Sequence, residues 1–127
     1  VYGSAAFRGH VTPPGHPEQV ARLSAVEAGL APLSPALRDC PVADDAQILR
    51  CHPAAYLARV RAAVPSEGWA QLDGDTYLSP GSLDAALRAV GGQLGEAAQR
   101  LGLSRHALRH QMGKLGMHEA EGGTLDA

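Results

Sequence analysis

The stretch that decides the expected fold is GQLGEAAQRLGLSRHALRHQMGKLGM, residues 92–117. Two short helices are expected here, at about 94–101 and 104–115, on either side of Gly102, a residue that tolerates the positive φ of a tight turn. Ser104 suits the N-cap of the second helix. The apolar residues that would face inward recur at i, i+4 and i+7: Leu108, Met112 and Leu115. This pattern predicts a helix-turn-helix.

The opposite face of the second helix is basic. It carries Arg105, His106, Arg109, His110 and Lys114. Arginine suits bidentate contact with guanine, and both Lys and Arg hold phosphate. The pattern favours duplex DNA as the partner, with a solvated basic surface as the alternative.

Charge is distributed unevenly along the chain. Residues 1–92 carry seven basic and nine acidic side chains, and residues 118–127 carry three acidic side chains and no basic one. Between them, residues 93–117 carry four basic side chains against Glu96. A polyanion would therefore prefer only the middle segment. We expect the acidic tail, 118–127, to be disordered.

The segment LGEAAQRLGLSRHALRHQMGKLGM, with its SR-x-x-LR-x-x-x-x-x-LG spacing, resembles the Fis-type helix-turn-helix, named for the factor for inversion stimulation. It is also similar to the DNA-binding tail of bacterial enhancer-binding activators. The resemblance implies a recognition helix in the major groove and a homodimer. The DNA contacts that it implies are Ser104, Arg105, His106, Arg109, His110 and Lys114.

Three stretches in residues 1–92 form a second pattern: HVTPPGHPEQVARL (10–23), CHPAAYLARV (51–60) and LDGDTYLSPGSLDAALRAVGG (72–92). In this order they resemble the opening of the histone deacetylase and acetoin-utilisation family of zinc amidohydrolases. The resemblance implies the start of an α/β domain whose loop at 73–79 borders the active-site entrance. It matches Asp75 to a carboxylate that contacts substrate at this rim.

The chemistry of that family requires a zinc ion held by two Asp and one His, paired histidines and a tyrosine. The chain has no His-His pair and no D-x-H sequence. We therefore assign no catalytic residue and no metal ligand, expect zinc only in a complete domain of the family, and favour the absence of enzymatic activity. His10 is expected to be a loop residue, His16 to pack at or cap a helix start, and Asp73 and Asp75 to form turns.

Periodicity and breakers predict the remaining elements. Helices are expected from Pro17 to about Leu30, at about 45–51, from Pro53 to about Val64, and over 82–90, where Gly91-Gly92 should end the helix. On the first helix, one apolar stripe is expected from Val20, Leu23, Val26 and Leu30, and residues 69–81 should form a loop.

Taken together, the sequence predicts a mainly α fold: a small helical bundle that ends in a helix-turn-helix, with at most one or two short strands from a truncated α/β region. The expected parts are 1–92, 93–117 and 118–127. Cys40 and Cys51 are expected to be free thiols. Without an 18-residue apolar run or a signal-peptide pattern, we expect no membrane partner and a cytoplasmic location. The predicted function is sequence-specific DNA binding in transcription regulation, and the alternative is a non-catalytic deacetylase-family fragment.

Overall fold

The computed structural model of the chain describes residues 1–100 and confirms the mainly α prediction. The elements in chain order are β1 (Tyr2–Gly3), the 3-10 helix η1 (Ala5–Gly9), α1 (Val20–Leu30), the 3-10 helix η2 (Ala31–Leu33), β2 (Arg38–Asp39), α2 (Asp45–Ile48), α3 (Ala54–Ala63), β3 (Ala70–Gln71), β4 (Tyr77–Leu78) and α4 (Ser82–Arg100). The four strands exceed the one or two expected, but each spans only two residues.

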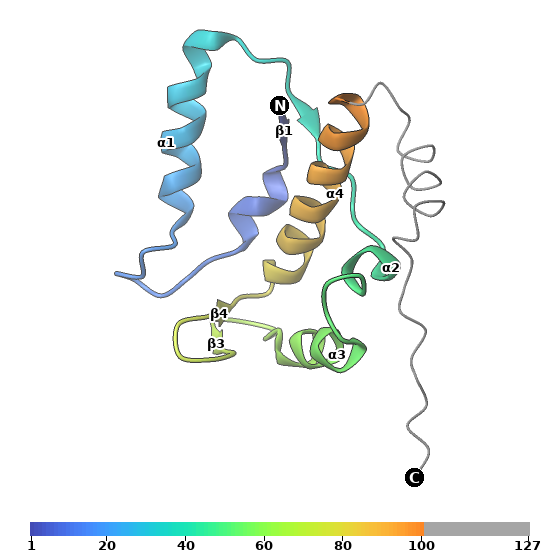
Figure 1. The fold of residues 1–127 in the computed structure, drawn as a ribbon. Helices are drawn as coiled ribbons and strands as arrows, with labels where there is room; N and C mark the ends of the chain where they lie inside the picture. The colour runs from blue at the N-terminus through green and yellow to red at the C-terminus, as the bar shows by residue number, and fades with distance from the viewer. Residues whose placement is uncertain (101–127) are drawn as a thin grey trace.

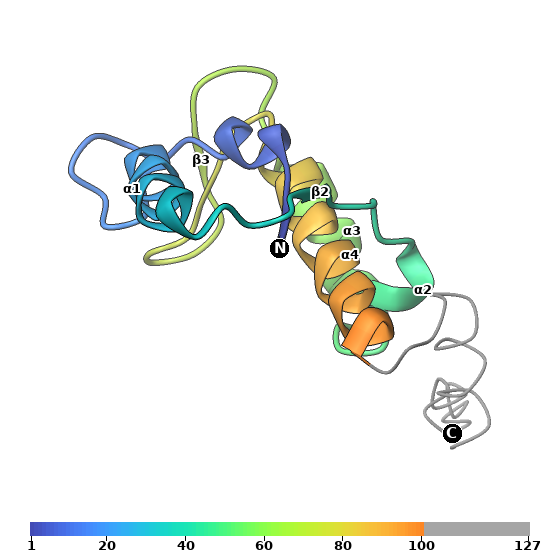
Figure 2. The same ribbon diagram turned by 90° about the horizontal axis from the view of Figure 1, so that it is seen from above.

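The first sheet is a β-helix-β unit. β1 and β2 are parallel, with Tyr2 opposite Arg38 and Gly3 opposite Asp39, and α1 lies on the connection between them. Figure 1 shows β1 between α1 and β2, with α4 on the far side of β2 from α1. The view from above has the same order (Figure 2).

The longest element, α4, runs through Gly91-Gly92 without interruption, so the predicted helix break at these residues is wrong. Both glycines are buried. A Cβ on Gly91 would overlap the Pro41 carbonyl, and one on Gly92 would lie 2.7 Å from Cys40 Sγ. The strand-to-loop segment after β2 therefore packs directly on the helix backbone, and this packing outweighs the poor helix propensity of glycine.

Among residues 1–100 the buried apolar residues are few: Cys40, Ala43, Leu57, Leu78 and Ala85. Burial raises the pKa of the Cys40 thiol. Cys40 and Cys51 are both free thiols, as predicted. No residue of α1 is buried, and Val26 in its apolar stripe is 59% exposed. The apolar stripe is therefore only partly covered within residues 1–100, with Val20, Leu23 and Leu30 half-buried.

The two short helices begin close to their predicted starts. Asp44 and Gln47 form a capping box at the start of α2, and Pro53 is the N-cap of α3. α2 ends at Ile48, earlier than expected. The Arg61 guanidinium joins α3 to α2 through two hydrogen bonds to the Asp45 carboxylate, at 2.8 and 2.5 Å.

The predicted loop at 69–81 contains a hairpin. β3 and β4 pair antiparallel, with Ala70 opposite Leu78 and Gln71 opposite Tyr77. The turn residues Asp73-Gly74 lie at its tip, as their turn chemistry predicts. In the part of the chain that the structure describes, no helix is long and apolar enough to cross a membrane.

Candidate functional site

The start of α4 is fixed by a pair of buried serines. The Ser79 amide donates to Ser82 Oγ at 2.7 Å. Ser79 Oγ donates to the Gly9 carbonyl at 2.9 Å and accepts from the Val11 amide at 2.8 Å. Ser79 is 2% exposed, so these bonds replace all contact of its hydroxyl with water. They join the exit of the β3–β4 hairpin to the loop that follows η1.

Glycine permits this junction. A Cβ on Gly81 would lie 2.5 Å from the Gly9 carbonyl oxygen and 2.7 Å from Gly9 Cα. Two backbones therefore cross in direct contact at the S-P-G-S sequence, residues 79–82. Ser82 is the first residue of α4, and its hydroxyl accepts from the Ser79 amide.

His10 extends the serine pair toward a carboxylate. Its Nδ1 lies 2.7 Å from Ser82 Oγ, and its Nε2 lies 3.8 Å from Glu18 Oε2. A hydroxyl, an imidazole and a carboxylate in a row are also the parts of a nucleophilic site. Ser82 Oγ, however, already accepts the Ser79 amide, and Ser82 is 5% exposed. We therefore assign this row to anchoring the helix start.

The tip of the hairpin is held from two sides. Asp73 Oδ1 accepts from the Thr76 amide at 3.0 Å and from the Asp75 amide at 3.3 Å, and hydrogen bonding from Thr76 and then Asp75 lowers the pKa of Asp73. The prediction that Asp73 forms a turn is confirmed. Arg59 on α3 donates to the Leu72 carbonyl at 2.8 Å. The tip is thus tied both to itself and to α3.

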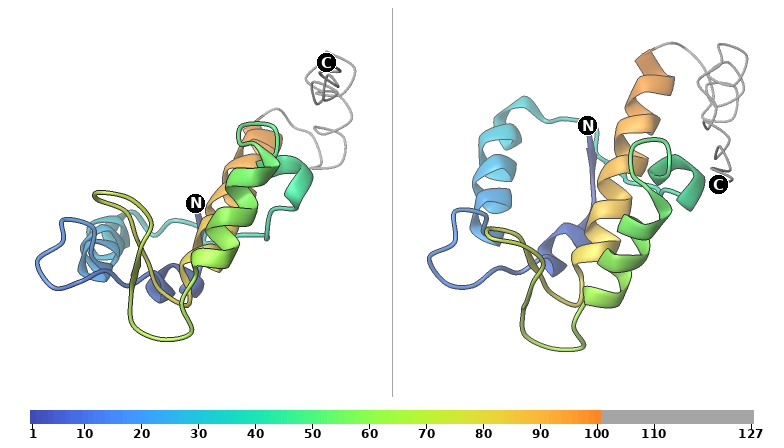
Figure 3. Two further views of the ribbon diagram at one scale, coloured as in Figure 1. Left: turned by 90° about the horizontal axis from the view of Figure 1, so that it is seen from below. Right: turned by 60° about the horizontal axis from the view of Figure 1, so that its bottom comes forward.

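His16 joins the hairpin tip to the loop before α1. Its Nδ1 accepts from the Glu18 amide at 3.1 Å, and its Nε2 lies 3.1 Å from the Asp75 carbonyl oxygen. The ring therefore bridges the loop before α1 and the hairpin tip through both of its nitrogens. The ring also meets Tyr77 edge-on, with centroids 5.5 Å apart. Figure 3 shows the two loops side by side at one end of the molecule.

Asp75, the predicted rim residue, lies at this junction and is exposed. Its backbone is fixed through its amide and its carbonyl, while its side chain reaches solvent. Sequence reasoning did not anticipate the contributions of His10 and Ser79. Two serines flanking Pro-Gly directly before a helix were the available signal for the serine pair, but no local pattern places His10, which is 72 residues from Ser82.

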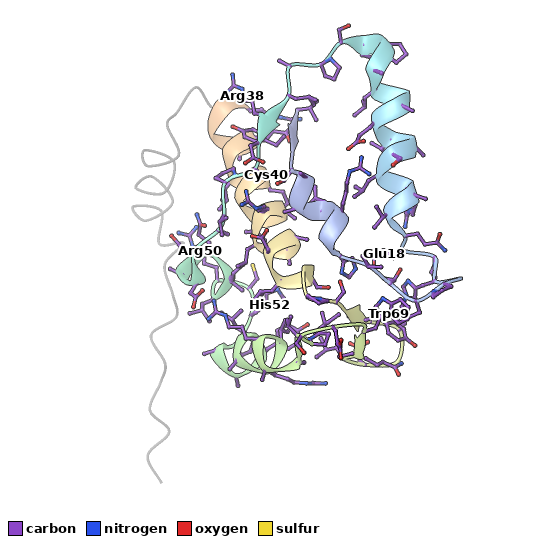
Figure 4. All side chains as sticks on the ribbon, turned by 180° about the vertical axis from the view of Figure 1, so that it is seen from behind. Glu18, Arg38, Cys40, Arg50, His52 and Trp69 are labelled. Carbon is purple, nitrogen blue, oxygen red and sulfur yellow. The ribbon has the colours of Figure 1, made fainter. Side chains whose placement is uncertain are left out.

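A pocket of about 410 Å³ opens beside the serine pair, between η1, α1 and α4. Its apolar walls come from Phe7, Leu23, Leu78, Ala85, Ala86 and Ala89. His10, Glu18 and Ser82 supply polar groups in the lining. Figure 4 shows Glu18 at the foot of α1, at the same end of the molecule as Trp69, which starts the β3–β4 hairpin.

The residues that the sequence assigns to DNA contact lie outside the described range: Ser104, Arg105, His106, Arg109, His110 and Lys114. Nearest to them, Arg100 pairs with Glu96 through Nη2 and Oε1 at 2.7 Å. Within residues 1–100, no three His, Cys, Asp or Glu side chains gather as metal ligands would. The described side chains therefore do not fit a zinc site, and we derive no step through zinc.

Comparison with known proteins identifies the family. The sequence matches the histone deacetylase domain over residues 16–124. It is also 40% identical, over 94 residues, to an uncharacterized protein of Synechocystis sp.; the aligned part covers 68% of this chain and 31% of that protein. The chain thus spans about a third of the length of this relative.

The family match contains the loop with His16, the β3–β4 hairpin and α4, and it continues across residue 92. It thereby confirms the resemblance to the deacetylase family over residues 16–92 of the stretch assigned to it. The match also covers 93–117, where the Fis-type resemblance stays a prediction, as do the boundaries at 92 and 117. Because the match covers well over half of its residues, the chain belongs to the family of proteins with a histone deacetylase domain.

Proposed function

We propose that this chain forms the amino-terminal part of an amidohydrolase domain of the histone deacetylase family, in which it frames the substrate entrance. The observation that carries the proposal is the family match over residues 16–124. The chain spans 31% of its Synechocystis relative, so bond cleavage falls to parts of the domain beyond residues 1–100. Zinc binding falls to those parts as well.

The contribution of this chain to substrate binding is assigned to Asp75. Its backbone is held by Asp73 and His16, which reduces the entropy lost when the loop orders around a ligand. An exposed carboxylate on such a loop can accept hydrogen bonds from the backbone amides of an acylated peptide. Asp75 would therefore orient the substrate without taking part in proton transfer.

The test uses two polypeptides: the 127-residue chain and the part of the Synechocystis relative that lies outside the 94 matched residues. Co-expressed, they should hydrolyse an acetyl-lysine peptide, and removal of zinc with a chelator should abolish the activity. Asp75→Asn should raise KM by roughly tenfold with a smaller change in kcat, because it removes binding shared by ground and transition states. Glu67→Gln, an exposed acid before the hairpin, is the matched control.

Two results would count against the proposal. An assembled pair that hydrolyses no acyl-lysine or acyl-polyamine substrate would refute the amidohydrolase assignment. Equal KM values for Asp75→Asn and Glu67→Gln would refute the role of Asp75.

A second candidate function is duplex DNA binding by residues 93–117, with the chain acting as a homodimer or as a monomer. The observation in its favour is the local excess of four basic side chains over one acid. Two observations weaken it: Arg100 is paired with Glu96, and residues 94–100 continue α4 instead of starting a separate helix. Fluorescence anisotropy with a DNA duplex at two salt concentrations tests this function, because an affinity that comes from phosphate contacts falls steeply as the salt concentration rises.

A further inference from the structure

Trp69, at the entry of the β3–β4 hairpin, presents an aromatic surface to solvent. It is the single tryptophan of the chain, and it is 47% exposed. It takes part in none of the ring–ring contacts within residues 1–100. Gly68, with a φ of +65°, turns the chain directly before it. Figure 4 shows Trp69 at the same end of the molecule as Glu18. An indole that is anchored at its base and open on one side is suited to binding a ligand.

The register of the hairpin determines which face carries the indole. Side chains alternate along a strand, so Trp69 and Gln71 point to the same face. Gln71 lies opposite Tyr77, whose ring meets His16 edge-on. Gln71 Nε2 donates to the Gly74 carbonyl at 3.2 Å, so its side chain reaches toward the tip and away from Trp69. The indole therefore forms the uncovered end of this face.

Asp75 lies at the other end of the same hairpin. The Leu72 amide donates to the Thr76 carbonyl at 2.8 Å, so Asp75 directly adjoins the last pair before the turn. Trp69 is three residues before Leu72, and a strand rises by about 3.3 Å per residue, which places Trp69 about 10 Å from the tip. A peptide bound in extended form at Asp75 would cover this distance with roughly three residues.

The charge of the two rim loops defines what such a peptide should bring to the indole. Residues 10–19 and 69–81 contain the exposed acids Glu18, Asp73 and Asp75 and no Lys or Arg. Arg59 reaches the hairpin from α3, but it donates to the Leu72 carbonyl. The face of an indole attracts alkylammonium groups, and a negative surface raises their local concentration. Both features favour a cationic group over a neutral or an anionic one.

We propose that Trp69 is a specificity-determining residue of the substrate entrance, whose indole binds a positively charged side chain about three residues from the acyl-lysine. The inference rests on the proposed function, which places Asp75 at this entrance. Asp75 orients the backbone beside the acyl-lysine, and Trp69 recognises a charge farther along the same peptide. The substrate class is thus an acylated peptide with a lysine at that distance.

The test compares acetyl-lysine peptides that differ by one charge. One carries a lysine three residues from the acetyl-lysine, on either side in separate peptides. The other carries norleucine there, which keeps the alkyl stem without the ammonium group. Because the chain has a single tryptophan, the emission of Trp69 reports binding to the 127-residue chain directly. The lysine peptide should change this emission with an affinity roughly two- to fivefold higher than that of the norleucine peptide.

The co-expressed pair of polypeptides gives a second readout. Its kcat/KM should favour the lysine peptide by the same factor. Trp69→Leu should remove the preference, whereas Trp69→Phe should keep part of it, because phenylalanine retains a weaker aromatic face. Tyr56→Leu removes an exposed aromatic side chain of α3 outside the hairpin and should leave the preference unchanged. If Trp69 served folding alone, its loss would lower turnover of both peptides equally.

The outcomes separate this proposal from the proposed function. Emission that responds selectively to the lysine peptide, in a chain whose assembled pair hydrolyses nothing, supports the cation site and overturns the amidohydrolase assignment. Equal responses to the two peptides, or no response to either, overturn the role of Trp69 even where the pair is active. A preference lost in Asp75→Asn but kept in Trp69→Leu would also overturn it, because the carboxylate would then recognise the charge.

Discussion

Replacing Gly91 by alanine tests whether α4 is continuous and packed across residue 92. An added Cβ would overlap the Pro41 carbonyl oxygen and lie 2.7 Å from the Pro41 carbonyl carbon and 3.2 Å from the Ala43 amide nitrogen. These are backbone atoms, and the Ala43 amide is itself held by the Leu87 carbonyl at 3.0 Å, so no rotamer change relieves the clash. Overpacking of this kind costs about 1–3 kcal/mol.

The intrinsic effect of the same change has the opposite sign. Alanine is better than glycine in a helix interior by about 1 kcal/mol. We expect the clash to dominate, so that Gly91→Ala lowers the free energy of unfolding by up to about 2 kcal/mol. For a unit of about 100 residues, this corresponds to a Tm lower by up to roughly 15 °C.

Gly29→Ala in α1 is the matched control, because a Cβ there meets no atom within 4 Å. It should raise the stability by about 0.5–1 kcal/mol. Thermal unfolding followed by circular dichroism at 222 nm measures both variants. If Gly91→Ala stabilises the chain as Gly29→Ala does, residues 91–92 form a solvent-exposed linker, and the packing of α4 on residues 41–43 is wrong.

The other predictions concern hydrogen bonds, charge, catalysis and DNA. Ser79→Ala should lower the free energy of unfolding by about 1–3 kcal/mol, because it removes two part-buried hydrogen bonds, to the Val11 amide and the Gly9 carbonyl; urea denaturation measures this, and a change below about 0.5 kcal/mol would contradict it. The hydrogen bond from Arg61 lowers the pKa of the Asp45 carboxyl. Their pairing therefore stabilises the fold at pH values above the ordinary Asp pKa of about 4, and this stabilisation is lost as the pH falls through the lowered pKa. The stability difference between the chain and its Asp45→Asn variant should therefore shrink below about pH 4 in acid-unfolding curves, and a constant difference would argue against the pairing. The 127-residue chain alone should release no acetate from an acetyl-lysine peptide with zinc present, and hydroxamate-sensitive release would overturn that expectation. Combined Arg105→Ala and Arg109→Ala replacement should weaken duplex binding at low salt if residues 104–115 read DNA, whereas unchanged affinity in a gel-shift titration would remove that function.

Local signals in the sequence were sufficient for the helix starts but not for the end of α4. Pro53 and the Asp44–Gln47 capping box act within one helical turn, so they can be recognised without knowledge of the fold. By the same local criteria, the Gly91-Gly92 pair predicts the end of a helix. The helix continues because residues 40–43, about fifty positions earlier, pack against the two glycines. Contacts at that sequence separation leave no periodic trace in a single sequence.

In α1 the sequence identified an apolar stripe but not what packs against it. Spacing identified Val20, Leu23, Val26 and Leu30 as one face, but a face predicts only that a partner exists. Within residues 1–100 the face is only partly covered: Val20 and Leu23 line the pocket with η1 and α4, whereas Val26 is 59% exposed. The resemblance to the deacetylase family was recognisable because its motifs are contiguous. The serine pair and its contact with His10 could not be recognised, because these residues meet only after the chain folds.

The pocket and the rim loop share their anchoring groups. His10 and Ser82 line the pocket between η1, α1 and α4, and Ser82 also holds the Ser79 amide. Ser79 is the residue that directly follows β4, so its position sets where the hairpin leaves the body of the molecule. Ser79 and Ser82 are 2% and 5% exposed, so their hydrogen bonds are already shielded from water and strengthened by that shielding. The buried cluster that starts α4 therefore also fixes the position of the hairpin that carries Asp75.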